Sequence, residues 1–352
     1  MEIEFKERNP VHLEHYTGLP SLGAAWIVSA RKVGGEQIPI VTSGLSLRDR
    51  LGFLKIRLGI GRNRYTVPPG LYGIGDPDSR SPVFVTANYK MSFDILRHDL
   101  KSVHGWILVL DTRGINVWCA AGKGTFSTEE LIRRINLTRL SQIVSHHELI
   151  LPQLGAVGVA AHEVKKRIGF KVNYGPVYSR NIQAYLENGR KVTSEMRRIR
   201  FPLRERFAVT PLELFPALKY FPFFILFFLL KTLLLDEPLI LCLQDSLGLL
   251  GAVLTGSVLV PLLLPIIPGR AFSVKGALLG LVYSLLWSFS TAQSLTNTIT
   301  NCLIYTSVSS YLALNFTGTS TFTNMSGVYK EMKVSLPLMI PSLMSGLILY
   351  WF

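Results

Sequence analysis

One cysteine stands in the first 210 residues of this 352-residue chain, and its neighbours make it the first candidate for chemistry. Cys119 lies in NVWCAAGKGTF (116–126), directly after an apolar run, GWILVL (105–110), that predicts a buried strand. A thiolate is both a nucleophile and a ligand for soft or redox-active metals. Three uses of Cys119 therefore stand open: an activated nucleophile, a metal ligand and a buried structural residue.

A nucleophilic thiolate needs a neighbouring base or cation, and the nearby stretches offer Lys123, His146, His147 and His162. The sequence alone brings none of them to Cys119, and adjacent histidines on a strand point in different directions. Without a catalytic role, each of these histidines would be a polar surface or core group, which is the more common case.

Phosphate-binding motifs are absent from this stretch. A Walker-type loop needs G-x-x-x-x-G-K-[ST], but Val117 takes the place of the first glycine and Gly124 that of the hydroxyl residue. No G-x-G-x-x-G follows the first strand, which also excludes a dinucleotide fingerprint.

A metal held through Cys119 needs other donors. The chain has three cysteines, Cys119, Cys242 and Cys302, without a CxxC pair, so neither an iron–sulfur site nor a disulfide framework is expected. One thiolate can still be the axial ligand of a metal that a macrocycle already holds. A flat ligand of that kind could approach closely beside Trp118 and the small residues Ala120, Ala121, Gly122 and Gly124.

Strands and helices that would position Cys119 alternate along residues 82–189. The pattern predicts strands at 82–89, 105–110, 141–146 and 170–175, and helices at 91–100, 128–136, 158–169 and 181–189. Ser127 and Glu130 form a capping box before the second helix, and Gly169 ends the third. The alternation predicts an α/β, Rossmann-like fold, a mostly parallel sheet wrapped by helices.

Ligands of such sheets bind outside the carboxyl ends of the strands. The segments that follow the predicted strands are therefore expected to meet at one edge: VTANY (85–89), NVWCAAGKGTF (116–126), VSHHELILPQLG (144–155) and VNYGPV (172–177).

Charge divides the chain into two halves. Residues 211–352 hold six of the 37 Lys and Arg and five of the 23 Asp and Glu, which leaves 31 and 18, a net +13, in residues 1–210. A basic surface suits a membrane, an acidic partner or an anionic ligand. No nucleic-acid motif accompanies the charge, so nucleic acid is not expected as a partner.

Five apolar segments in the second half are long enough to cross a membrane: 214–235, 246–267, 273–291, 298–316 and 334–352. The fourth is rich in Thr, Ser and Asn and is expected to pack against its neighbours. Basic and uncharged loops alternate, which places 190–206 in the cytoplasm and the C-terminus outside. A soluble protein with buried helices is the alternative.

Three regions follow: an N-terminal extension (1–47), a cytoplasmic α/β domain (48–210) and a five-helix transmembrane domain (211–352). The first residues lack the apolar stretch of a signal peptide, so the first domain is expected to stay in the cytoplasm. WIVSA (26–30) predicts a strand or part of a loosely attached tail. The basic, Gly- and Pro-rich residues 48–75 read either as a ligand- or lipid-binding surface or as a solvated one.

From about residue 48 to the C-terminus the chain resembles the mercury-methylating corrinoid protein family. The resemblance is carried by GIGRNRYTVPPGLYGIG, PVFVTANYKMSFD, VLDTRGINVWCAAGKGTF, VSHHELILPQLGAVGVAAHEVKK, GFKVNYGPV and TFTNMSGVYKEMK. Several of these stretches are shared with the corrinoid iron–sulfur proteins of the acetyl-CoA pathway. The sequence departs from the family's pattern at His147 and at 177–182.

The resemblance implies a cobalamin-type corrinoid, bound base-off with Cys119 as the lower ligand of cobalt. A cap helix would contact the corrinoid through Asn116, Val117, Trp118, Cys119, Ala120, Ala121, Gly122 and Lys123. Its edge and tail would contact Thr86, Asn88, Tyr89, Ser145, His146, Gln153, Gly155, Tyr174, Gly175 and Pro176.

The resemblance also implies a function in anaerobic one-carbon metabolism: a methyltransferase of the inner (cytoplasmic) membrane, multi-pass, that methylates Hg(II). The expected partners are a dicluster 4Fe-4S ferredoxin-like protein, a folate-dependent methyltransferase that delivers the methyl group, and membrane lipid. Two alternatives stay open: a membrane-bound corrinoid methyl carrier with another acceptor, and a non-catalytic scaffold for a redox partner.

Overall fold

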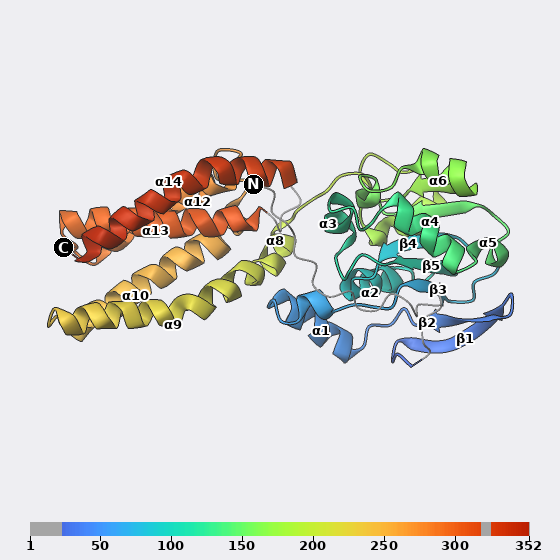
Figure 1. The fold of residues 1–352 in the computed structure, drawn as a ribbon, viewed down its shortest axis with the longest axis horizontal. Coiled ribbons are helices and arrows are strands. Elements are labelled where there is room, and N and C mark those ends of the chain that lie inside the picture. The colour runs from blue at the N-terminus through green and yellow to red at the C-terminus, as the bar shows by residue number, and fades with distance from the viewer. Residues whose placement is uncertain (1–22, 318–324, 352) are drawn as a thin grey trace. The chain divides into compact units, whose positions relative to one another are not determined.

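The computed structural model describes residues 23–317 and 325–351, which form two compact units (Figure 1). The first unit contains the described residues up to Phe53 together with Gly61–Ile199, and the second contains Leu54–Ile60 and the described residues from Arg200 onward. Residues 1–22 of the predicted extension, and 318–324 of the predicted last loop, lie outside the described residues.

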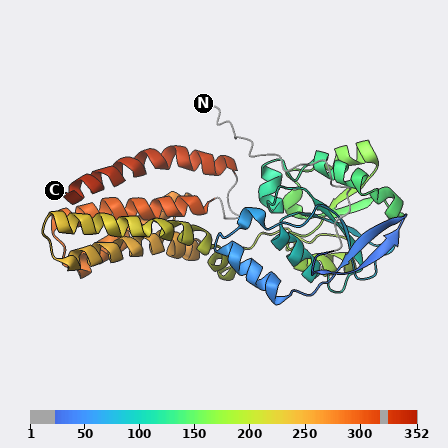
Figure 2. The ribbon, with the colours of Figure 1, turned by 60° about the horizontal axis from the view of Figure 1, so that its bottom comes forward.

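The first unit is built on a seven-stranded sheet of order β1-β2-β3-β5-β4-β6-β7. Figure 2 shows its first two strands in blue. Its strands are β1 Ile27–Val33, β2 Glu36–Val41, β3 Gly70–Ile74, β4 Val83–Ala87, β5 Gly105–Leu110, β6 Glu148–Leu151 and β7 Lys171–Tyr174. The neighbours β5, β4, β6 and β7 run parallel, as predicted. The β1–β2 and β3–β5 pairs are antiparallel, so the whole sheet is mixed rather than mostly parallel.

Part of the predicted N-terminal extension belongs to this sheet. β1 and β2 form a hairpin whose turn contains Gly34 and Gly35 at φ +58° and +88°, backbone angles that glycine adopts without strain. β2 then pairs with β3 in parallel. The strand predicted at WIVSA is confirmed, and the alternative of a loosely attached tail is wrong for residues 27–41.

Helices cover both faces of the sheet. One apolar core lies under α3 Val117–Gly122, α4 Thr128–Leu137, α5 Leu140–Ile143 and α6 Ala161–Ile168. The other lies under α2 Lys90–Asp99 and α7 Ile182–Glu187. The remaining helical segments before residue 200 are α1 Leu47–Arg57 and the 3-10 turns η2 Arg62–Arg64, η3 Gln153–Gly155 and η4 Ser179–Asn181. The Ser127 cap of α4 and the Gly169 cap of α6 are confirmed.

The predicted strand at 141–146 is wrong. Residues Leu140–Ile143 form the short helix α5, and the strand begins later, at Glu148. Both SQIV and ELIL are short apolar runs, whose period does not distinguish a helix turn from a buried strand. The pairing of β6 with β4 and β7 decides between them.

The second unit is helical. Its segments are α8 Leu203–Val209, α9 Pro211–Leu234, α10 Leu239–Leu254, the π-helical turn Thr255–Leu259, α11 Val260–Leu263, α12 Phe272–Ser290, α13 Leu295–Phe316 and α14 Met325–Trp351. Among the described residues, four helical stretches are long and apolar enough to cross a membrane: Leu203–Leu234, Leu239–Leu263, Phe272–Ser290 and Gly327–Trp351.

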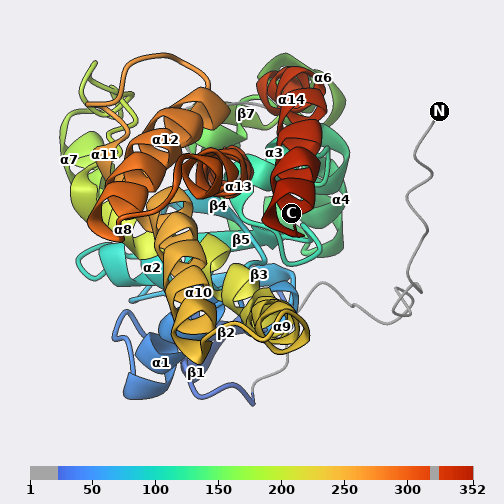
Figure 3. The same cartoon turned by 90° about the vertical axis from the view of Figure 1, so that its left-hand side faces the viewer.

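The predicted fourth span is a helix, α13, but it is not among those four. Its Thr, Ser and Asn residues lower its hydropathy, and α13 lies between α12 and α14 (Figure 3). A Cβ on Gly276 or Gly280 of α12 would lie within 3 Å of α13, at Ala313 and Ser309. The predicted packing of this helix against its neighbours is confirmed.

Candidate ligand site at the carboxyl edge of the sheet

After β4 the chain forms β5 on one side of β4, and it later forms β6 on the other side. The position between β4 and β6 is therefore the topological switch point of the parallel strands. A cavity of about 250 Å³ lies outside the strand ends there. Its lining includes Thr86 near the end of β4, Pro152 after β6, Gly175 and Pro176 after β7, and Val117 of α3. The predicted meeting of these segments at one edge is confirmed for these residues.

Helix α3 carries Cys119 and has two unlike faces. Ala120 and Ala121 are buried in the core, so packing explains their small size. Cys119 is a half-buried free thiol, beside the exposed residues Gly122 and Lys123, three and four positions further along the helix. A Cβ on Gly122 would have no atom within 4 Å. The thiol therefore stands on the open face of α3, and half-buried Trp118 precedes it.

The first turn of α3 is fixed by its own sequence. The side-chain oxygen of Asn116 accepts a hydrogen bond from the backbone N–H of Cys119 at 2.9 Å, which caps the helix. The carbonyl of Cys119 accepts from the N–H of Lys123 at 3.0 Å. Both backbone groups of Cys119 are thus bound, which holds the residue that carries the thiol.

Asn88, directly after β4, holds the loop between β5 and α3. Its Oδ1 accepts from the N–H of Thr112 at 3.1 Å, from the Thr112 hydroxyl at 2.8 Å and from the N–H of Gly114 at 2.9 Å. Its Nδ2 donates to Asp111 at 3.3 Å. Asn88 is buried, so its side chain acts as a fixed brace of this loop. The next residue, Tyr89, is buried and its backbone bridges to Thr66.

Two glycines let the segment after β6 pack on α3. A Cβ on Gly158 would lie 2.0 Å from the carbonyl oxygen of Phe126 and 3.1 Å from Cα of Ala121. A Cβ on Gly155 would lie 2.6 Å from the ring of Phe126, which is fully buried. This close contact sets how α3 sits on the sheet edge.

Gln153, which follows β6, carries an unsatisfied polar atom. Its side-chain carbonyl Oε1 is buried and has no hydrogen-bond partner among the described residues. Leaving such an atom without a hydrogen bond costs about 1–3 kcal/mol of free energy, which a bound ligand with a donor group would recover. The neighbouring Tyr174 is satisfied, because its hydroxyl donates to the carbonyl of Val159, and burial raises its pKa.

Ser145 and His146 lie at the opposite edge. Both precede β6, and they contact the loop before β4: the N–H of Ser145 donates to Ser79 O at 2.8 Å, and His146 Nε2 is 2.9 Å from Ser81 O. The expectation that they join the other segments at the carboxyl edge is wrong, because β6 starts after them. Their role as ligand contacts gains no support from this geometry.

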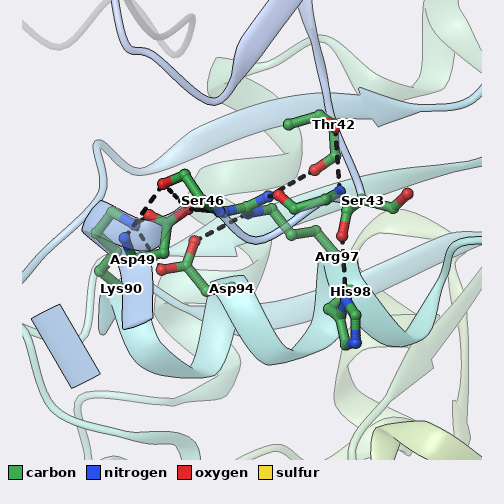
Figure 4. Close-up of polar contacts among 9 residues, drawn as sticks. Thr42, Ser43, Ser46, Asp49, Lys90, Asp94, Arg97 and His98 are labelled. Atoms are coloured by element: carbon green, nitrogen blue, oxygen red, sulfur yellow. Dashed lines mark hydrogen bonds and ion pairs between the residues drawn. The ribbon is translucent and has the colours of Figure 1, made fainter. Parts of the chain in front are cut away.

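A buried ion cluster fixes helix α2 (Figure 4). Ser92, Ile95 and Leu96 of this helix line the cavity. Arg97 is fully buried and binds Asp94 at 2.8 Å and Asp49 at 2.9 Å. Lys90 binds Asp49 at 2.7 Å and also pairs with Asp94. Arg97 further donates to the carbonyls of Thr42 and Gly44 at 2.7 and 2.6 Å. The cluster joins α2 to the start of α1, and no motif in the sequence announced it.

Among the described residues, no group of three or more His, Cys, Asp or Glu side chains gathers in a way that could hold a metal ion. Cys119 is a free thiol.

Comparison with known proteins shows what part of this chain is similar to. Residues 53–186 match the family model described as CO dehydrogenase/acetyl-CoA synthase delta subunit. The acetyl-CoA decarbonylase/synthase complex subunit gamma of Archaeoglobus fulgidus is 34% identical over 128 residues, 36% of this chain and 27% of that protein.

Two further relatives are similar to part of the chain. The corresponding gamma subunit of Methanothermobacter thermautotrophicus is 31% identical over 161 residues, 44% of this chain and 34% of that subunit. The corrinoid/iron-sulfur protein large subunit of Moorella thermoacetica is 29% identical over 114 residues, 32% of this chain and 25% of that protein. The chain thus spans about a quarter to a third of the length of these relatives. Part of the chain is thus similar to the CdhD family model, within residues 53–186, and to the gamma subunit of acetyl-CoA decarbonylase/synthase and the corrinoid/iron-sulfur protein large subunit.

Proposed function

We propose that this chain binds a base-off corrinoid whose cobalt is ligated by Cys119, and that it transfers a methyl group from that cofactor to Hg(II). The observation that carries the proposal is a lone thiol on the open face of the short helix α3, whose Val117 lines a crevice at the switch point. The chain is also similar in part to a corrinoid protein. Hg(II) as the acceptor rests on the resemblance of NVWCAAGKGTF to the mercury-methylating family.

The residues at the edge fit such a ligand. The buried Oε1 of Gln153 lacks a donor, and corrin side-chain amides are donors. The crevice, at about 250 Å³, falls short of the roughly 300–1,000 Å³ of sites that enclose a whole ligand. It suits the extended tail of a large ligand, whose flat part would lie against the open face of α3. Gly122 leaves room there beside the thiol.

The protein's contribution is to hold one sulfur in place. Asn116 caps the turn that carries Cys119, and Asn88 braces the loop that leads into it. Gly158 packs so closely against α3 that a side chain at position 158 would have no room. This contact restricts movement of the helix away from the sheet edge. These contacts act as an outer layer that orients an axial ligand.

A methylcorrinoid would supply a methyl group that leaves cobalt with the bonding electron pair, which is what an electrophile such as Hg(II) requires. The Cys119 thiolate would donate electron density to the metal and favour that departure. Methylmercury would be the product, and a two-electron reduction of the cofactor by an external donor would be needed before it accepts another methyl cation equivalent.

The remaining partners belong to the same proposal. Three cysteines are too few for a 4Fe-4S cluster, so reduction would come from a separate dicluster ferredoxin-like protein, and the basic first 210 residues suit an acidic one. The methyl group would come from a methylated folate through another methyltransferase. Four long apolar helices support a place in the cytoplasmic membrane, with the first unit on the cytoplasmic side.

A second candidate keeps the cofactor and changes the acceptor. The family model that matches residues 53–186 and the gamma-subunit relatives are named for acetyl-CoA synthesis and cleavage rather than for mercury. A membrane-bound methyl carrier in one-carbon metabolism would use the same thiol and the same crevice.

Full-length protein, purified with corrinoid and loaded with methyl groups, tests both candidates. We expect about one corrinoid per chain, methylmercury on addition of Hg(II), and loss of that product in Cys119→Ala. The controls Cys242→Ala and Cys302→Ala should keep it, because both cysteines lie in helices of the second unit. Methyl transfer to thiol or arsenic acceptors but not to Hg(II) would favour the second candidate, and a chain without bound corrinoid would leave only a scaffold.

A further inference from the structure

The second unit contains a small pocket with two buried cations. A cavity of about 190 Å³ is lined by Phe201, Leu264, Pro265 and Phe272, and by the basic residues Arg206 and Lys275. Arg206 is 9% exposed and Lys275 is 7% exposed. No carboxylate is among the lining residues. Full charges are seldom buried without an opposite charge, because removing them from water costs several kcal/mol each.

Neutral main-chain oxygens are the partners of both cations. Lys275 Nζ donates to the carbonyls of Leu264 and Ile267, each at 2.6 Å. The Nη1 atom of Arg206 donates to the carbonyl of Leu262. These bonds cap the end of α11, which explains hydrogen bonding but leaves the two charges without a counterion. Within the described residues neither side chain forms an ion pair.

Arg206 also carries an unsatisfied donor. Its Nε is buried and has no hydrogen-bond partner in the described structure. A guanidinium presents its donors as a planar fork that matches the oxygens of a phosphate. An anionic oxygen in the pocket would satisfy Nε and neutralise the charge in one step.

The surroundings point to the phosphate of a lipid. Four of the six lining residues are apolar, and the ring of Phe272 lies 6.2 Å from that of Phe316. On α8, which carries Arg206, Leu203 and Phe207 are four positions apart and are 57% and 63% exposed. A helix that turns its cation inward and its apolar residues outward suits an acyl-chain environment.

We propose that this pocket binds the phosphate of an anionic phospholipid, held by Arg206 and Lys275 between α8, the end of α11 and the start of α12. The inference rests on the proposed membrane location of the second unit, and it is independent of corrinoid and of mercury. Basic pockets between membrane helices are known places for anionic headgroups.

Native mass spectrometry of the full chain from detergent, with phosphatidylglycerol or phosphatidylcholine added, tests the pocket. We expect wild type to retain phosphatidylglycerol in preference to phosphatidylcholine. In Lys275→Met the retained phosphatidylglycerol should fall about fivefold, because one cation near an anionic lipid is removed. Lys275→Arg should keep the lipid, and so should Arg270→Gln, which removes an exposed cation from the loop that precedes α12.

A second variant guards against a simple folding defect. Leu264→Glu places a carboxylate in the pocket in the position of the lipid's anion. It should lose phosphatidylglycerol while its thermal midpoint without lipid does not fall, since the new charge pairs with the two cations.

Three results would overturn the proposal. They are equal retention of the two lipids by wild type, unchanged phosphatidylglycerol in both Lys275→Met and Leu264→Glu, and displacement of the lipid by millimolar inorganic phosphate, which would assign the pocket to a soluble anion. Corrinoid content and carbonate extraction, measured on the same preparations, separate this outcome from a failure of the proposed function. A membrane-bound, corrinoid-loaded chain without lipid preference contradicts the pocket alone.

Discussion

The position of one thiol depends on a single amide. Asn116 accepts the N–H of Cys119, and this cap defines the first turn of α3. The resemblance to the mercury-methylating family implied a cap helix at residues 116–123, and α3 spans Val117–Gly122. The sequence did not predict which face of the helix is open, since that depends on the contact of Ala121 with Gly158.

Replacing Asn116 should weaken the cofactor site through position rather than contact. Asn116→Ala removes the cap, which costs about 1 kcal/mol of helix stability. We expect faster loss of corrinoid on gel filtration, with Asn116→Asp restoring retention because a carboxylate accepts the same N–H. Equal retention by Asn116→Ala and wild type would show that the cap does not position the ligand.

Two glycines should respond in opposite ways. Gly122→Leu points into open space, so unfolding free energy should stay within about 0.5 kcal/mol of wild type while corrinoid binding is lost. Gly158→Ala meets the Phe126 carbonyl, so it should destabilise the protein by roughly 1–3 kcal/mol. Urea unfolding and corrinoid content measure both. Normal corrinoid content in Gly122→Leu would place the ligand elsewhere.

At the scale of elements, the parallel strands β4, β5 and β7 follow from apolar runs and turn residues. β6 was misplaced because SQIV and ELIL look alike to a period test, and β2 and β3 were missed. β3 has the sequence GLYGI and is fully buried. Its two glycines do not favour a strand, so the local sequence does not predict one. Pairing with strands distant in the sequence, rather than local preference, forms β3 and orders the sheet.

The ion cluster at α2 predicts a specific dependence of stability on pH. Burial raises the pKa of Asp49, but hydrogen bonds from Lys90 and Ser46 outweigh it and lower the pKa from 3.8 to about 2. A lowered carboxyl pKa adds stability above the unfolded value, here about 2 kcal/mol, which is lost as pH falls from about 4 to about 2.

Asp49→Asn should therefore lower the free energy of unfolding by about 3 kcal/mol at pH 7, because Arg97 and Lys90 lose a partner. The difference from wild type should shrink as pH approaches 2, where Asp49 is protonated anyway. Asp76→Asn is the control, since the exposed Asp76–Arg31 pair contributes little. A difference that stays constant from pH 7 to pH 2.5 in urea titrations would contradict this role of the cluster.

At the scale of the whole molecule, the division into a basic first part and an apolar second part was readable from charge counts alone. The number of membrane crossings was not, because α13 carries hydroxyl and amide groups and is buried between α12 and α14. Its 22 residues give a length of about 33 Å, enough to cross a bilayer.

If α13 crosses the membrane, shielded by its neighbours, the chain crosses five times and its C-terminus lies outside. A C-terminal alkaline phosphatase fusion should then be active, and a C-terminal green fluorescent protein fusion should be dark. Fusions after Leu235, between α9 and α10, should behave in the same way and serve as the reference. The reverse pattern at the C-terminus alone would mean that α13 does not cross.

The central claim is the bond between the Cys119 sulfur and cobalt. Cobalt K-edge absorption of the corrinoid-loaded full chain measures it directly, because sulfur and nitrogen scatter at different distances and strengths. We predict one sulfur neighbour in wild type, in Cys242→Ala and in Cys302→Ala, and none in Cys119→Ala. A nitrogen in that position in wild type, or a sulfur that persists in Cys119→Ala, would contradict the account.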